Sequence, residues 1–173
     1  MKYQNEGGPD LVQCFDLLRS ATRPSAPQVL RLLDYVIFNA LIGNHDAHAK
    51  NFSLLYSGKA PVLAPSYDTL STAAYPTMTQ KMAMKIGSNY KFSEVQARHW
   101  EQFAESVGLT KAQAKRRILE LAKLLPANAR KLQFAPERGF VGNAVVEQIS
   151  TLIEHCCALT IRRLNVPATE SSV

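Results

Sequence analysis

Cysteine is scarce in this sequence, and long apolar runs are absent from it. The three cysteines are Cys14, Cys156 and Cys157, an odd number with two adjacent in the chain. This is not the pattern of a disulfide framework, so we expect a reducing, cytoplasmic environment. The longest apolar run, residues 35–42, is interrupted by Asn39 and is far shorter than the ~18–20 residues that cross a bilayer. The first ten residues, MKYQNEGGPD, lack the apolar centre of a signal peptide, so we expect no membrane association.

The remaining composition is typical of one globular domain. Of the 173 residues, 46% are hydrophobic and 20% are charged. We expect one domain over residues 1–166 and a polar, flexible tail over 167–173. The formal charge of +6 permits an anionic partner such as phosphate, nucleotide or DNA, but does not demonstrate one.

Hydrophobic periodicity predicts a mainly helical chain. A first helix over residues 10–20 is followed by a helix over 25–44, with Ser25 as its cap and Leu30, Leu33, Ile37 and Leu41 as its buried stripe. Further helices are predicted over 94–107 with Ser93 as cap, over 111–125 between the cap Thr110 and the stop Pro126, over a short stretch at 127–133, and from Gly142 or Asn143 to about 164.

Between these helices the period changes to that of strands. Residues 51–56 and 61–67 flank Ser57-Gly58-Lys59, which predicts a small β-hairpin. Residues 81–86 alternate and predict another short strand or an extended segment. The expected fold class is therefore α+β, mainly α, with a small β-hairpin.

The segment 43–51, GNHDAHAKN, gathers chemically active side chains at the junction of helix and strand. It contains Asp46, His48, Lys50 and Asn51, and Asp68 follows at the far end of the hairpin. Because the first residue of one hairpin strand lies beside the last residue of the other, we expect Asn51 and Asp68 to be neighbours.

This arrangement suits phosphoryl transfer. The reaction depends on a positioned nucleophile and on Mg²⁺ that offsets the charge of ATP. Asn51 and Asp68 would bind the nucleotide's Mg²⁺ through hard oxygen ligands. Asp46 would accept or orient the proton of a substrate hydroxyl.

These residues also resemble a known family. NHDAHAKNFSLLY, LAPSYDTLSTAAYP and KMAMKIG, with KYQNEGGP and RHWEQFAESVGL, are similar to the C-terminal region of HipA-like serine/threonine kinases, the toxins of HipA–HipB toxin–antitoxin systems. The resemblance implies a protein-kinase-like C-terminal lobe whose β-hairpin carries the catalytic loop. It implies that Asp46 is the catalytic aspartate, with His48 and Lys50 beside it, and that Asn51 and Asp68 are metal ligands. Thr69-Leu70 follows Asp68, so we do not expect the activation switching of eukaryotic kinases.

The resemblance also implies partners, and the sequence differs from the family in one respect. It implies a HipB-like antitoxin, operator DNA bound through the antitoxin complex, and a protein substrate, with an aminoacyl-tRNA synthetase as one possible class. The sequence contains no glycine-rich loop followed by an ATP-binding lysine. We therefore expect a separate N-lobe as a further partner, and expect the chain alone to bind ATP·Mg²⁺ poorly and to show little kinase activity.

Two other functions stay open. His45-Asp46, with His48, Asp68 and His99, would form the site of a metal-dependent HD-type phosphohydrolase. Alternatively, the chain is a non-catalytic kinase-lobe remnant that binds an antitoxin, DNA or a separate N-lobe. A DNA-facing surface would use basic residues on the later helices, namely Lys111, Lys115, Arg116, Arg117, Lys123, Arg130, Lys131, Arg162 and Arg163.

Overall fold

Polar cap residues in the sequence set where several helices begin in the computed structural model, which describes residues 1–56 and 58–166. Asp10 accepts the Gln13 backbone N–H and caps α1, Leu11–Ala21. Thr110 caps α4, Lys111–Gln133, in the same way, and Asn143 caps α5, Ala144–Asn165. The cap at Thr110 was predicted, and the last helix was predicted to start at Gly142 or Asn143.

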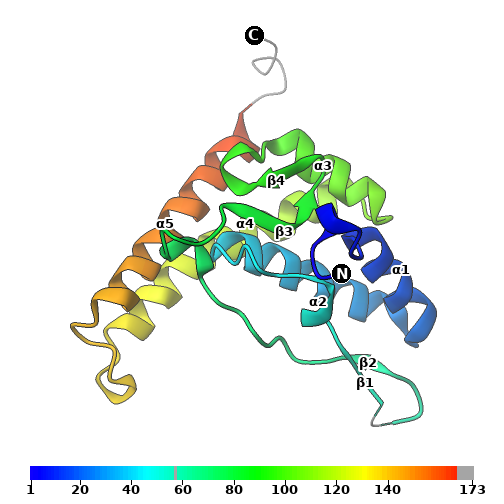
Figure 1. Ribbon diagram of the computed structural model, residues 1–173, viewed down its shortest axis with the longest axis horizontal. Helices are drawn as coiled ribbons and strands as arrows, with labels where there is room; N and C mark the ends of the chain where they lie inside the picture. The colour runs from blue at the N-terminus through cyan, green and yellow to red at the C-terminus, as the bar shows by residue number, and fades with distance from the viewer. Residues whose placement is uncertain (57, 167–173) are drawn as a thin grey trace.

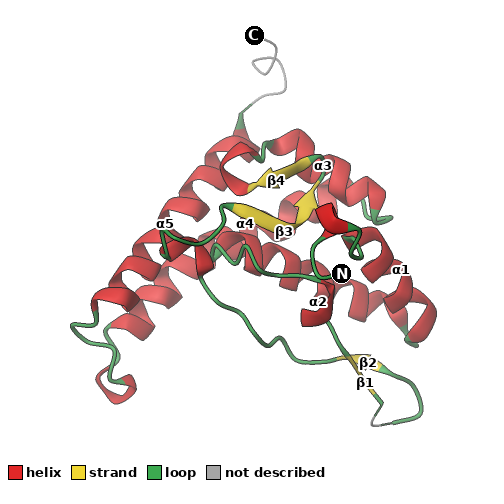
Figure 2. Cartoon of the chain, in the orientation of Figure 1, coloured by secondary structure: helices red, strands yellow, loops and turns green. Residues whose placement is uncertain are grey.

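The elements form a helical body with two small antiparallel strand pairs (Figures 1 and 2). The other α-helices are α2, Ser25–Leu41, and α3, Ala97–Ser106. The strands are β1, Leu54–Leu55, β2, Val62–Leu63, β3, Lys81–Ile86, and β4, Asn89–Lys91. The predicted fold class is therefore confirmed. The expected turn residue Ser57 and the expected tail 167–173 lie outside the described residues.

Helix α2 is the central element, and its buried face differs from the predicted stripe. Leu33, Ile37 and Leu41 are fully buried as expected, but Leu30 is 46% exposed. Because α2 is contacted by α1, α4, α5 and β2, its buried surface is wider than one stripe and includes Val29, Leu32, Val36 and Ala40. Ser25 was predicted as the cap, but it is the first helical residue and Pro24 holds the cap position.

Aromatic side chains join α1 and α3 in the core. The rings of Phe15 and Phe103 meet edge to face with centroids 5.9 Å apart, and Trp100 lies 6.1 Å from Phe103. The prediction that Ser93 caps this third helix is wrong. Ser93 lies in a separate 3₁₀ turn, Phe92–Glu94, and Gln96 holds the cap position of α3.

Helix α4 continues through Pro126, which was predicted to end it. It runs to Gln133 as one helix of 23 residues, and the separate short helix at 127–133 is part of it. Figure 1 shows α4 and α5 lying side by side along one flank of the molecule. We infer that packing against α5 keeps α4 helical despite the missing N–H of proline.

Replacing Pro126 with alanine is expected to raise the free energy of unfolding by about 0.5–2 kcal/mol, because alanine restores a helix hydrogen bond. Chemical denaturation measures this difference. Pro136→Ala is the matched control. Pro136 begins a short 3₁₀ turn where no such bond is lost, so little change is expected. Destabilisation by Pro126→Ala would mean that α4 depends on a bend at this proline.

Among the described helices, α5 is long and apolar enough to cross a membrane by length and composition, with a mean hydropathy of 1.2 over an 18-residue window. Polar residues such as Gln148 and Glu154 interrupt α5, so it is not an uninterrupted apolar run of the kind that the sequence was expected to lack. The core helix of a soluble protein passes the same test.

Cys156 and Cys157 are buried on α5, and all three cysteines are free, as predicted.

Candidate functional site

The segment 43–51 begins where α2 ends, and a glycine makes the turn. Gly43 has φ +72°, and a Cβ there would lie 2.8 Å from the Cβ of Ala73. A side chain at this position would therefore meet both backbone strain and a clash. The turn directs the chain from α2 into a loop and then into the 3₁₀ turn Ala49–Asn51, which leads to β1.

The hairpin brings Asn51 and Asp68 together. Leu54 pairs with Leu63 and Leu55 with Val62, so the strands are shorter than predicted but antiparallel, as expected of a hairpin. Asn51 Nδ2 donates to Asp68 Oδ2 at 2.7 Å, across 17 positions of sequence. The predicted neighbourhood of the two side chains is confirmed. Asp68 is exposed and has φ +55°, a left-handed conformation that aspartate tolerates better than most residues.

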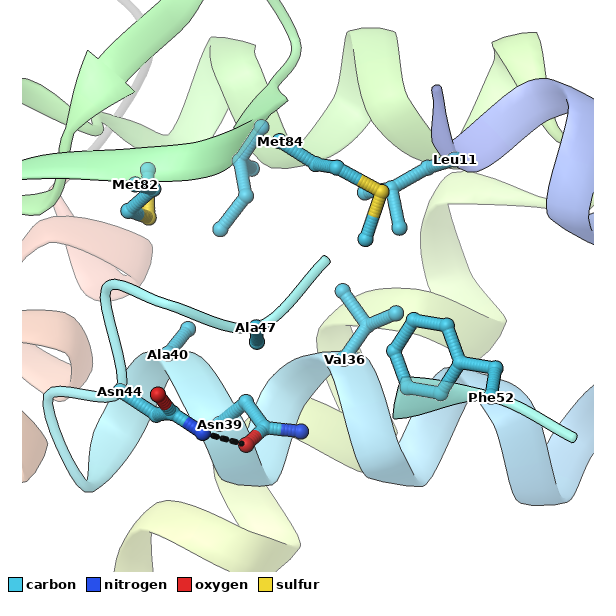
Figure 3. Close-up of a pocket in the computed structure, with 10 residues that line it drawn as sticks. Leu11, Val36, Asn39, Ala40, Asn44, Ala47, Phe52, Met82 and Met84 are labelled. Atoms are coloured by element: carbon cyan, nitrogen blue, oxygen red, sulfur yellow. Dashed lines mark hydrogen bonds between the residues drawn. The ribbon is translucent and has the colours of Figure 1, made fainter. Parts of the chain in front are cut away.

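Asn44 connects the two halves of the site. Its buried Nδ2 donates to the Asp68 carbonyl at 3.1 Å and to Asn39 Oδ1 at 2.8 Å, while its Oδ1 accepts the Asp46 backbone N–H at 3.2 Å. Figure 3 shows the Asn39–Asn44 bond at the end of α2. One side chain therefore fixes the backbone of both Asp46 and Asp68.

Asp46 is contacted by the N-terminal segment. Lys2 Nζ lies 2.9 Å from Asp46 Oδ2, and Tyr3 Oη donates to Asp46 Oδ1 at 3.0 Å. Both carboxylate oxygens are thus engaged by residues more than 40 positions away. The carboxylate remains about one third exposed.

His48 and Lys50 occupy different environments. His48 is buried, its ring meets that of Tyr3 edge to face, and its Nδ1 has no hydrogen-bond partner among the described residues. Burial, followed by the charge of Lys2, lowers the pKa of His48, so the imidazole is neutral at pH 7. The Lys50 side chain is exposed, and it forms no ion pair within residues 1–56 and 58–166.

His45 and His99 do not join the site. The His45 Nδ1 lies 3.2 Å from the Thr79 carbonyl, and His99 lies on α3, where it contacts Asn89. Within the part of the chain that the structure describes, no three His, Cys, Asp or Glu side chains are grouped to hold a metal ion. The phosphohydrolase interpretation therefore finds no support in the arrangement of these residues.

Two hollows flank the loop. A small one between α2 and β3, next to the loop, is lined mainly by apolar side chains of α1, α2, β3 and the loop, including Val36, Ala47 and Met84 (Figure 3). A larger one, with a volume of about 280 Å³, lies between α1, α2 and the hairpin. Its lining includes Ala49, Phe52 and Ser53, which flank Asn51, together with Cys14 and Leu63.

Several of the basic residues suggested for DNA are engaged within the chain. The ion pairs and hydrogen bonds are Lys111 to Glu101 and Glu105, Arg116 to Glu120, Arg117 to Asp34 and Glu120, Arg130 to Glu154, and Arg163 to the carbonyls of Ser93 and Val95. These contacts give such residues a structural role without DNA.

Sequence reasoning missed four residues that position the site: Lys2, Tyr3, Asn39 and Asn44. Lys2 and Tyr3 belong to the motif KYQNEGGP, but nothing in its composition indicates contact with a loop that begins at residue 43. Asn39 was read only as an interruption of an apolar run. A buried polar residue on the apolar face of a helix is a signal, because such a group needs a partner.

A family model described as the HipA-like C-terminal domain matches residues 1–129. A protein of Sinorhizobium fredii strain NGR234, described as "Putative kinase Y4mE", is 48% identical over 120 residues, which are 69% of this chain and 29% of that protein. The serine/threonine-protein kinase toxin HipA of Shewanella oneidensis MR-1 is 27% identical over 119 residues, covering 69% of this chain and 27% of the toxin. The chain thus spans less than a third of the length of these relatives.

The same fold occurs in a solved structure. A chain of the complex of Shewanella oneidensis MR-1 HipA, HipB and operator DNA matches 93% of this chain with a TM-score of 0.76 and 23% identity. This chain covers 39% of that chain. The match confirms the predicted kinase-like fold.

Proposed function

Because the chain belongs to the HipA-like C-terminal domain family, we propose that it is the catalytic-loop half of a kinase that transfers the γ-phosphate of ATP to a serine or threonine of a protein. The observation that carries the proposal is the 2.7 Å contact between Asn51 and Asp68, with Asp46 fixed beside them through Asn44. Asn44 thereby links the backbone at Asp46 to the backbone at Asp68, whose side chain contacts Asn51.

The donor set fits Mg²⁺. Asp68 offers a carboxylate whose Oδ1 accepts no hydrogen bond from any described residue, and the carbonyl oxygen of Asn51 is oriented by the His48 backbone N–H at 2.9 Å. Both are hard oxygen ligands, and Mg²⁺ characteristically uses one or two such protein ligands together with substrate phosphates. When bound with ATP, Mg²⁺ would neutralise charge on the β- and γ-phosphates.

The chain's own residues would position the acceptor. Asp46 would receive a hydrogen bond from the substrate hydroxyl and take its proton as the hydroxyl oxygen bonds to the γ-phosphorus and the bond from that phosphorus to the oxygen of the departing ADP breaks. His48 would line the site as a neutral imidazole. The exposed Lys50 would contact a phosphate of the nucleotide. The 280 Å³ hollow beside Asn51 would provide an apolar floor for the base of the nucleotide.

The partners proposed for the whole protein follow from the relatives. HipA from Shewanella oneidensis was solved with HipB and operator DNA, so we propose a HipB-like antitoxin and, through it, operator DNA for this protein. A protein substrate, such as an aminoacyl-tRNA synthetase, and the nucleotide-binding lobe of the kinase complete the proposed assembly. The cell compartment proposed for it is the cytoplasm.

The metal site can be tested on the chain itself with Mn²⁺ as a paramagnetic substitute for Mg²⁺. We expect Mn²⁺ to broaden the amide NMR signals of residues 46–52 and 67–69 before those of other regions. Asp68→Asn should remove most of this selective broadening, because it removes the charge. Asparagine also tolerates the left-handed conformation at this position, so the fold should persist.

Asp16→Asn is the matched control, since Asp16 is an exposed carboxylate whose ion-pair partner is Arg19, three residues along α1. It should leave the broadening near Asp68 unchanged. Equal broadening of the amide signals around Asp16 and around Asp68 in the wild type would contradict a metal site at Asp68. Unchanged broadening in the Asp68→Asn variant would contradict it as well.

A further inference from the structure

Contacts within the N-terminal segment, residues 2–8, and with β3 keep the side chains of Lys2 and Tyr3 at Asp46. The Gln4 side chain accepts the Lys85 backbone N–H of β3 at 2.9 Å, and the Gly8 N–H donates to the Tyr3 carbonyl at 2.9 Å. A Cβ at Gly8 would lie 2.8 Å from that carbonyl oxygen, so the close return of the chain requires glycine. Residues 2–8 are thus attached to β3 and closed on themselves.

This attachment gives Lys2 and Tyr3 defined places. The Tyr3 ring packs edge to face against His48, and Lys2 Nζ lies 5.2 Å from the centre of the Tyr3 ring. Tyr3 holds one oxygen of Asp46, and Lys2 holds the other. With both oxygens engaged, the carboxylate is fixed in rotation, and the ammonium of Lys2 stands directly beside it.

The catalytic loop supplies no cation of its own at this point. His48, two residues after Asp46, is buried, and neither its side chain nor that of Lys50 forms an ion pair with Asp46 among the described residues. In the described portions of the chain, Lys2 is the residue that forms an ion pair with Asp46. A transferred phosphoryl group carries charge on three oxygens and requires a positive partner beside the acceptor.

We propose that Lys2 is a further binding residue of the phosphoryl-transfer site, whose ammonium contacts the γ-phosphate of ATP next to Asp46. An ammonium has three donors, and Asp46 uses one of them. The Lys2 side chain is 41% exposed, which leaves its other donors accessible. Its hydrogen bond to Asp46 raises the pKa of Lys2, so the group stays charged at neutral pH.

This inference rests on the proposed kinase function and adds a residue from outside the catalytic loop. It predicts that Lys2 distinguishes nucleotides that carry a γ-phosphate from those that do not. The test is therefore a comparison of MgATP with MgADP. NMR titration of the chain up to millimolar nucleotide suits the weak binding expected for this half of the enzyme.

We expect the wild type to bind MgATP more tightly than MgADP, and Lys2→Met to weaken MgATP about tenfold while changing MgADP less than about twofold. Lys2→Arg keeps the charge and should recover most of the preference for MgATP. Lys85→Met removes a lysine from neighbouring β3 that forms no ion pair with Asp46, and it should change neither affinity.

Each result decides the role of Lys2. Equal weakening of both nucleotides by Lys2→Met, or no weakening, would show that Lys2 only stabilises the loop and would overturn the inference. If the wild type bound neither nucleotide, the nucleotide site itself would be wrong, and the role of Lys2 would fall with it. Two-dimensional amide spectra of each variant establish that differences arise in folded protein.

Discussion

Asp46→Asn is expected to lower phosphoryl transfer by about 10²–10⁴-fold, the contribution typical of a positioned general base. The change removes the proton acceptor but keeps the size of the side chain and one oxygen for the Tyr3 hydroxyl. Transfer of labelled phosphate from ATP to protein would be measured with the chain combined with the nucleotide-binding lobe of its kinase. The residue is expected to act in catalysis rather than in folding.

Thermal denaturation separates these two roles. The ion pair between Asp46 and Lys2 is partly exposed, and pairs of this kind contribute about 0–1 kcal/mol, so the melting temperature should fall by at most about 4 °C. Asp16→Asn provides the control for loss of an exposed, ion-paired carboxylate. A large loss of melting temperature in Asp46→Asn, with normal activity in the folded fraction, would show that Asp46 is a structural turn residue.

Asn44→Ala is expected to have the next largest effect, because it affects both stability and activity. The substitution removes a side chain that binds the Asp68 carbonyl, the Asn39 side chain and the Asp46 backbone N–H. Buried partners left without hydrogen bonds cost about 1–3 kcal/mol of the free energy of unfolding. The loss of alignment between Asp46 and Asp68 should lower phosphoryl transfer by about 10²-fold, the effect of a displacement near 1 Å.

The control for Asn44→Ala is Asn128→Ala. Asn128 is exposed on α4, where its side chain donates to the Leu124 carbonyl in the preceding turn. Chemical denaturation and the phosphate-transfer assay should show little change in this variant. If Asn44→Ala retained full activity and stability, the hydrogen bonds at Asn44 would not be what positions the two aspartates.

Prediction from the sequence succeeded where a local pattern has one structural meaning. Thr110 caps α4 as expected, and α5 begins at the predicted place, because the short polar side chains of Thr110 and Asn143 satisfy backbone N–H groups of their own helices. Tertiary packing overrode local signals elsewhere. Pro126 does not end α4, which lies along α5, and Leu30 is exposed because α2 packs on several sides at once.

The expected roles of the site residues remain predictions, although their neighbourhood is now partly established. The hairpin expected from its turn residues predicted Asn51 near Asp68, and their side chains are hydrogen-bonded although both residues lie outside the two short strands. Register says nothing about the direction of Asp46, which lies on the loop before the strands. That direction depends on Asn44 and on the N-terminal segment.

The sequence by itself determined the helical body, the hairpin, the membership in the HipA-like C-terminal family and the pairing of Asn51 with Asp68. These features follow from periodicity, turn residues and motifs that act over short stretches of chain. Only the tertiary structure placed Lys2 and Tyr3 on Asp46, 44 and 43 positions away. It did so because attachment to β3 and a glycine return, rather than any local propensity, bring residues 2–8 to the loop.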